Sequence, residues 1–87
     1  MNSERGAIEK MHEEQGRQKI NEIMKKIDTT QYNIEVSTDI IADTPSDTIR
    51  EKLIEQNTRR QHAIGSMKKE ILDIEKTMEK RGKEVST

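Results

Sequence analysis

Two adjacent arginines, Arg59 and Arg60, are the first candidates for functional residues in this 87-residue chain. Guanidinium groups bind phosphates and carboxylates, so the pair could contact a nucleic acid, anchor a partner protein or lie on a solvated helix surface. Lys68 and Lys69 follow, and residues 56–69 contain no acidic residue. On a helix, however, Arg59 and Arg60 point about 100° apart, and no aromatic residue stands near them to stack on a base. Nucleic-acid binding is therefore the less favoured interpretation.

Catalytic and metal-binding chemistry lack the residue patterns that they need. The two histidines, His12 and His62, lie in different halves of the chain, and neither has further metal ligands at reliable spacing. Adjacent carboxylates such as Glu13 and Glu14 would need a cleft to work as acid and base, and a thin helical protein offers none. There is no cysteine, no glycine-rich phosphate loop and no Gly-x-Ser-x-Gly or His-Glu-x-x-His sequence. We therefore predict no enzyme activity, no cofactor and no metal site.

The composition limits the core on which any functional residue could be positioned. Only 29% of the residues are apolar and 38% are charged, with one tyrosine and neither phenylalanine nor tryptophan. Such a chain buries too little surface for a large core, so its apolar residues must lie in narrow stripes. The formal net charge of −1 gives no overall attraction to DNA or to an anionic membrane. Since no apolar run is long enough for a signal peptide or a membrane span, we expect a soluble, cytoplasmic protein.

The only proline, Pro45, marks the one strong break in an otherwise helical pattern. Thr44 is a candidate N-cap, Pro45 suits the first helical position, and Asp47 stands at the third position of the new helix. A first helix should end just before this segment, because the residue before a proline is disfavoured in α conformation. We predict a single domain over residues 1–87, with a helix at about 7–42, a turn at 43–44, a helix at about 45–81 and frayed ends.

Apolar residues recur at intervals of three, four or seven on both sides of the break, which places them along one stripe of each helix. The predicted core and interface residues are Ile20, Ile23, Ile27, Ile34, Ile41, Leu53, Ile64, Met67, Ile71, Ile74 and Met78. The first stripe is interrupted by Thr30 and Ser37, and the second by Asn57 and Arg60. If the chain folds back at the break, apolar residues face apolar residues. Thr30 then lies near Arg60, and Ser37 lies near Leu53, so the polar interruptions largely coincide.

These patterns predict an all-α fold, an antiparallel helical hairpin of two long amphipathic helices. Two helices, each about 50 Å long, leave one side of each apolar stripe wet, which favours self-association as a coiled coil or four-helix bundle. We expect a homodimer, because small proteins often pair through the same surface of each copy. Docking of a helix from another protein is the alternative. A membrane-bound amphipathic helix is not favoured, because the stripe is narrow and is flanked by charges of both signs.

The segment "NTRRQHAIGSMKKEILD" and the residues before it resemble the Tlp family of small acid-soluble spore proteins. That family carries an Asn-x-Arg-Arg motif followed by an Ile, a Met or Phe, a basic residue and Glu-Ile-x-Asp. The matching positions are Asn57, Arg59, Arg60, Ile64, Met67, Lys68, Glu70, Ile71 and Asp73. Upstream, Asn33, Ile34 and Glu35 match an Asn-Ile-Glu of the family. The resemblance covers residues 20–75, and about the first 19 residues look like an extension.

The resemblance implies a non-enzymatic protein that is made late in sporulation, held in the spore core and degraded on germination. A storage or structural role follows from it. The family name abbreviates "thioredoxin-like", but a chain without cysteine cannot perform thioredoxin chemistry. A small coiled-coil adaptor or regulator, which docks a helix of a partner protein, remains the alternative function.

Overall fold

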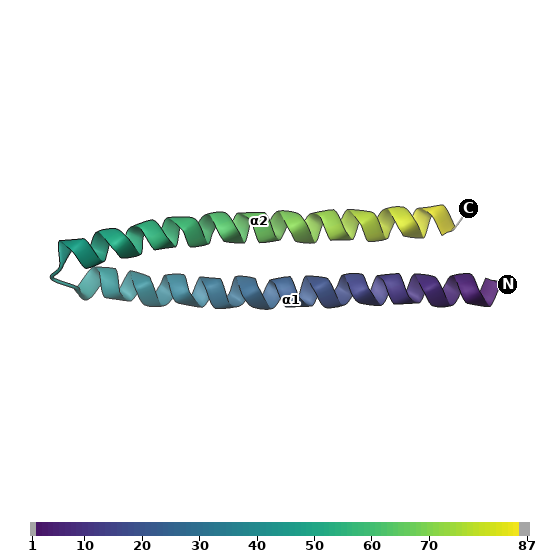
Figure 1. The fold of residues 1–87 in the computed structure, drawn as a ribbon, viewed down its shortest axis with the longest axis horizontal. Helices are drawn as coiled ribbons and strands as arrows, with labels where there is room; N and C mark the ends of the chain where they lie inside the picture. The colour runs from purple at the N-terminus through teal and green to yellow at the C-terminus, as the bar shows by residue number, and fades with distance from the viewer. Residues whose placement is uncertain (1, 86–87) are drawn as a thin grey trace.

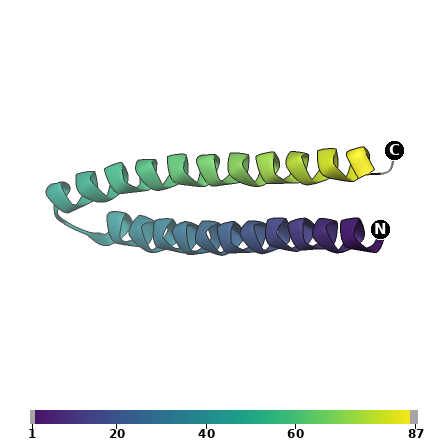
Figure 2. The same cartoon turned by 45° about the vertical axis from the view of Figure 1, so that its right-hand side comes forward.

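The computed structural model describes residues 2–85, and the side chains of residues 6–8 and 10–81. Two helices, α1 (Asn2–Asp43) and α2 (Asp47–Val85), lie side by side and antiparallel, as Figures 1 and 2 show from two directions. The hairpin is 68 Å long and only 15 by 12 Å across, with both termini at one end and the turn at the other (Figure 1). The predicted all-α helical hairpin is confirmed, and no strand occurs in the part of the chain that the structure describes.

The helices are longer than the sequence pattern indicates. The described part of α1 begins at Asn2 instead of about residue 7, and α2 continues to Val85 instead of about residue 81. Residues 2–6 and 82–85, which we expected to be frayed, are helical, whereas residues 1, 86 and 87 lie outside the described residues. The connection comprises residues 44–46 instead of 43–44, because α2 starts at Asp47 rather than at Pro45.

The start of α2 is capped by Ser46, so the prediction that Thr44 is the N-cap is wrong. The Ser46 Oγ accepts a hydrogen bond from the backbone N–H of Ile49 at 3.3 Å, which is the geometry of an N-cap. Thr44 is not free for that role, since its own N–H donates to the Ile40 carbonyl at 2.8 Å and so extends the bonding of α1. The Thr44 Oγ1 instead accepts from the Ser46 N–H at 3.3 Å. Pro45 therefore precedes the cap and does not occupy the first helical position.

Arg50 of α2 closes the turn by binding the end of α1. Its Nη2 donates to the Thr44 carbonyl at 2.8 Å and its Nε to the Ile41 carbonyl at 3.4 Å. The last carbonyls of a helix have no partner within that helix and carry partial negative charge. Nη1 of the same residue forms an ion pair with Asp47 at 2.6 Å. The positive charge that α1 lacks in its last turn is thus supplied from α2.

Within residues 10–81, the contact between the helices is formed by a single line of residues on each of them. On each side of the turn, every residue in 10–81 that is buried or half-buried follows a spacing of alternating three and four residues, and all the others are exposed; the spacing is two only between Thr44 and Ser46 of the connection. We call this series the seam: Gly16, Ile20, Ile23, Ile27, Thr30, Ile34, Ser37, Ile41, Thr44, Ser46, Arg50, Leu53, Asn57, Arg60, Ile64, Met67, Ile71, Ile74 and Met78. It contains all eleven residues that we predicted as core or interface.

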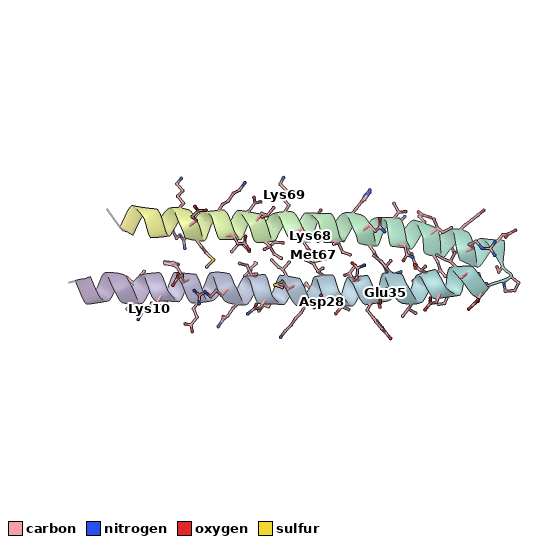
Figure 3. All side chains as sticks on the ribbon, turned by 180° about the vertical axis from the view of Figure 1, so that it is seen from behind. Lys10, Asp28, Glu35, Met67, Lys68 and Lys69 are labelled. Atoms are coloured by element: carbon pink, nitrogen blue, oxygen red, sulfur yellow. The ribbon has the colours of Figure 1, made fainter. Side chains whose placement is uncertain are left out.

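The apolar core within the seam is small. Only Ile23, Ile34 and Ile64 are buried apolar side chains, and no described side chain is completely shielded from solvent. Met67 lies between the helices at the centre of α2, as Figure 3 shows, but it is only half-buried. The two helices alone therefore bury few of the apolar groups that would offset the entropy of ordering 87 residues.

Candidate functional site

The seam contains one inter-helix hydrogen-bonded cluster of side chains, which we call the polar layer: Ser37, Asn57 and Arg60. The Arg60 Nη1 donates to the Ser37 Oγ at 2.8 Å across the hairpin and to the Asn57 Oδ1 at 2.9 Å within α2. Ser37 is only 5% exposed and is a buried polar residue of the core. Since a buried hydroxyl without a partner is costly, the hydrogen bond from the guanidinium group favours the burial of Ser37 in the seam.

The direction of the Arg60 side chain determines which residue of α1 it contacts. The seam register places Arg60 near Thr30, and the Arg60 guanidinium group reaches Ser37. Helical side chains lean toward the N-terminus of their own helix, and the N-terminus of α2 is at the turn. The long Arg60 side chain therefore reaches a residue of α1 that is closer to the turn. Thr30 instead donates its hydroxyl to the Lys26 carbonyl of α1 at 2.7 Å.

Arg59 has a different environment from its neighbour, as the rotation of about 100° between successive helical residues requires. It is exposed and forms an ion pair with Glu55 of the same helix at 2.6 Å. Lys68 and Lys69 are also exposed, and Lys69 points away from α1 (Figure 3). Arg60 donates a hydrogen bond within the polar layer, and Arg59 is paired with Glu55. The four basic residues of this segment therefore do not form one continuous basic surface.

The residues that match the family motif fall into two groups. Five of them lie on the seam, where they are buried or half-buried: Asn57, Arg60, Ile64, Met67 and Ile71. The other matching residues, Arg59, Lys68, Glu70 and Asp73, are exposed. Most of the motif residues therefore lie on the face of α2 that packs against α1, and not on an accessible binding surface.

Two residues that shape the ends of the seam, Arg50 and Gly16, were not predicted as core or interface residues. The alternating spacing, continued toward the turn from Leu53, reaches Arg50, so the pattern held a signal for it. Gly16 occupies a seam position where a Cβ atom would lie 2.7 Å from the Met78 Sδ. The missing side chain lets the Met78 thioether lie across α1 and leaves a shallow groove at the open end of the hairpin, which His12 also lines.

The described residues provide hydrogen bonding and packing but no reactive constellation. Among residues 10–81, no three His, Asp or Glu side chains lie close enough together to hold a metal ion. Every buried side-chain nitrogen or oxygen in this part of the chain has a hydrogen-bond partner. Neither described helix is apolar enough over a bilayer-spanning length to cross a membrane.

Comparison with known proteins identifies one family. Residues 11–81 match the family described as "Small, acid-soluble spore protein Tlp". This range includes every residue of the motif and begins upstream of Ile20, so part of the segment that looked like an extension lies within the family match. No curated protein and no solved structure matches the chain.

Proposed function

This chain belongs to the Tlp family of small, acid-soluble spore proteins, and we propose that it is a non-catalytic protein with a storage or structural role in the spore core. The narrow seam supports this proposal most strongly, because its apolar core consists of three buried isoleucines. A protein that is kept as a reserve must be digested quickly when it is needed. A hairpin with so little buried surface suits that requirement.

Proteases cut segments that open from the folded state. The free energy of local opening is smaller where fewer contacts are buried. Outside the seam, every described side chain in residues 10–81 is exposed. No second layer of structure covers either helix in the described residues. Proteolytic cleavage at most positions therefore requires the loss of only a few contacts.

The polar layer also supports a storage or structural role. Arg60 joins the two helices by a hydrogen bond in place of an apolar contact, which fixes the pairing of the helices without adding much burial. The result is a defined fold with modest stability. We therefore infer that the residues of the family motif on α2 maintain the fold and do not bind a substrate.

The time at which the protein is made tests the proposal. We expect an antibody against the chain to detect it in the forespore and in dormant spores, with little in vegetative cells. Its amount should fall during germination. Strong expression in vegetative cells would overturn the spore role. A small coiled-coil adaptor predicts a different result, namely a chain that persists through germination and is recovered with a fixed partner protein.

A further inference from the structure

The positions next to the seam differ between the two halves of the hairpin. In the half near the turn, residues 28–66, the exposed residues beside the seam on one side of the hairpin are Asn33, Ile40, Ile49, Gln56 and Ala63. The corresponding residues on the other side are Gln31, Thr38, Asp47, Ile54 and Gln61. Asp47 is the only charged residue among these ten positions. In the open half, six of the eight corresponding positions are charged, namely Arg17, Lys19, Lys26, Lys68, Glu70 and Glu75, and the other two are Met24 and Thr77.

The charge of the residues beside the seam indicates how many neighbours each half of the hairpin contacts. In a two-stranded coiled coil the positions beside the apolar seam face water and are typically charged, as they are in the open half. Uncharged residues at these positions widen the apolar stripe, which is the pattern of a helix that contacts more than one neighbour. Ile40 and Ile49 belong to this set, and they are 44% and 48% exposed in the isolated hairpin. The turn half of the hairpin therefore presents a surface that suits a further helical layer.

The first of the two sides is the better docking surface, and we call it the docking flank: Asn33, Val36, Ile40, Ile49, Gln56 and Ala63. The charged residues at its outer rim are Asp43 on α1 and, seven residues apart on α2, Lys52 and Arg59. Arg59 is paired with Glu55, whereas the structure gives neither Asp43 nor Lys52 an ion-pair partner among the described residues. A second identical surface can therefore oppose Asp43 of one copy to Lys52 of the other.

The opposite side of the hairpin has an acidic rim. Asp28 and Glu35 lie seven residues apart on the same face of α1 (Figure 3), and Glu51 of α2 lies on the same side of the hairpin. Two copies that met through this side would bring like charges together, which disfavours the contact.

We propose that a second copy of this chain docks on the docking flank, so that the turn halves of two hairpins form a four-helix arrangement. A second copy is the occupant because the rim charges are self-complementary. The isolated hairpin buries only three apolar side chains among its described residues, so docking of a second copy would stabilise it by mass action. The open halves, with charged residues beside the seam, stay two-stranded. This inference does not depend on the storage role.

Substitutions on the docking flank test the proposal. The wild-type chain should have twice its monomeric mass of 10.1 kDa in sedimentation equilibrium, with a melting temperature that rises with concentration. Replacing Ile40 and Ile49 by glutamine removes apolar surface without adding charge, and should weaken association by about tenfold or more. Leu72→Gln is the matched control, since Leu72 is 54% exposed in the open half and should leave association unchanged. A monomeric wild-type chain, or equal weakening by Leu72→Gln, would overturn the proposal.

A second measurement locates the interface without relying on destabilised variants. The chain has no cysteine, so Asn33→Cys and Tyr32→Cys each introduce a single thiol, the first on the docking flank and the second on the exposed outer face. Alkylation of the thiol at position 33 should slow by about tenfold as the protein is concentrated into its dimer, because docking removes that position from solvent. Alkylation at position 32 should not change. Equal rates at both positions, or protection of Gln61→Cys on the opposite side instead, would contradict the assignment.

Discussion

Replacing Arg60 by alanine should destabilise the hairpin much more than replacing its neighbour Arg59. The Arg60 guanidinium donates hydrogen bonds to the Ser37 hydroxyl at 2.8 Å and to the Asn57 side chain at 2.9 Å. Its removal leaves the Ser37 hydroxyl, which is 5% exposed, without a partner from α2. Arg59 forms only an exposed ion pair with Glu55. The two substitutions are chemically identical, so the difference between them isolates the polar layer.

The magnitudes follow from the burial of the two side chains. A hydrogen bond to a charged group contributes about 1.5–3 kcal/mol when buried, and since Arg60 is half-buried we expect a total loss of about 2 kcal/mol. An exposed ion pair between residues four apart contributes about 0.3–0.5 kcal/mol. With about 4–8 °C per kcal/mol for a chain of this size, Arg60→Ala should lower the melting temperature by about 8–16 °C and Arg59→Ala by about 2 °C.

The assay is thermal unfolding followed by far-ultraviolet circular dichroism, with all variants at the same protein concentration because the proposed association would make the melting temperature depend on concentration. A double-mutant cycle with Ser37→Ala should give a coupling energy of about 1 kcal/mol between Ser37 and Arg60. Added salt should reduce the effect of Arg59→Ala more than that of Arg60→Ala, because exposed charges are screened more strongly. Equal destabilisation by the two alanine substitutions would refute the view that Arg60 joins the helices.

Three further predictions concern local features of the hairpin. Gly65→Ala should raise the melting temperature by the equivalent of about 1 kcal/mol, because a Cβ atom at this position meets nothing within 4 Å. Gly16→Ala should raise the melting temperature less, because its new methyl group would lie 2.7 Å from the Met78 Sδ. Ser46→Ala should cost about 1 kcal/mol in urea unfolding and Ser46→Gly only a few tenths, as expected for an N-cap. Ile64→Ala should cost about 2 kcal/mol or more in the same assay, whereas Tyr32→Ser, at a side chain that is 64% exposed, should change stability by less than about 0.5 kcal/mol.

The pairing of the helices could be predicted because the signals for it are regular and local. Isoleucines at seven-residue intervals define one stripe, and Pro45 lies where the chain turns back. Thr30 and Ser37 keep the same spacing as the isoleucines, so the polar positions of the seam could be predicted as well as the apolar ones. Residue type and spacing are sufficient for these features, since they depend only on helical geometry.

The details of the turn and of the polar layer depend on interactions that spacing does not reveal. Thr44 and Ser46 are both good capping residues, and the choice between them depends on whether α1 uses the Thr44 N–H for its last hydrogen bond. The contact of Arg60 with Ser37 depends on the direction in which a long side chain leans. Arg50 acts on carbonyls that belong to the other helix, which becomes apparent only when the turn is built.

We propose that this member of the Tlp family is a lightly packed reserve protein, and the fate of the chain during germination is the decisive test. Spores are formed in medium with isotope-labelled amino acids, and the intact labelled chain is then measured by mass spectrometry in dormant spores and at intervals after germination begins. We predict that the intact chain disappears before outgrowth and that its label passes into free amino acids and new proteins. An intact labelled chain that persists into dividing cells would show that the protein is not a reserve.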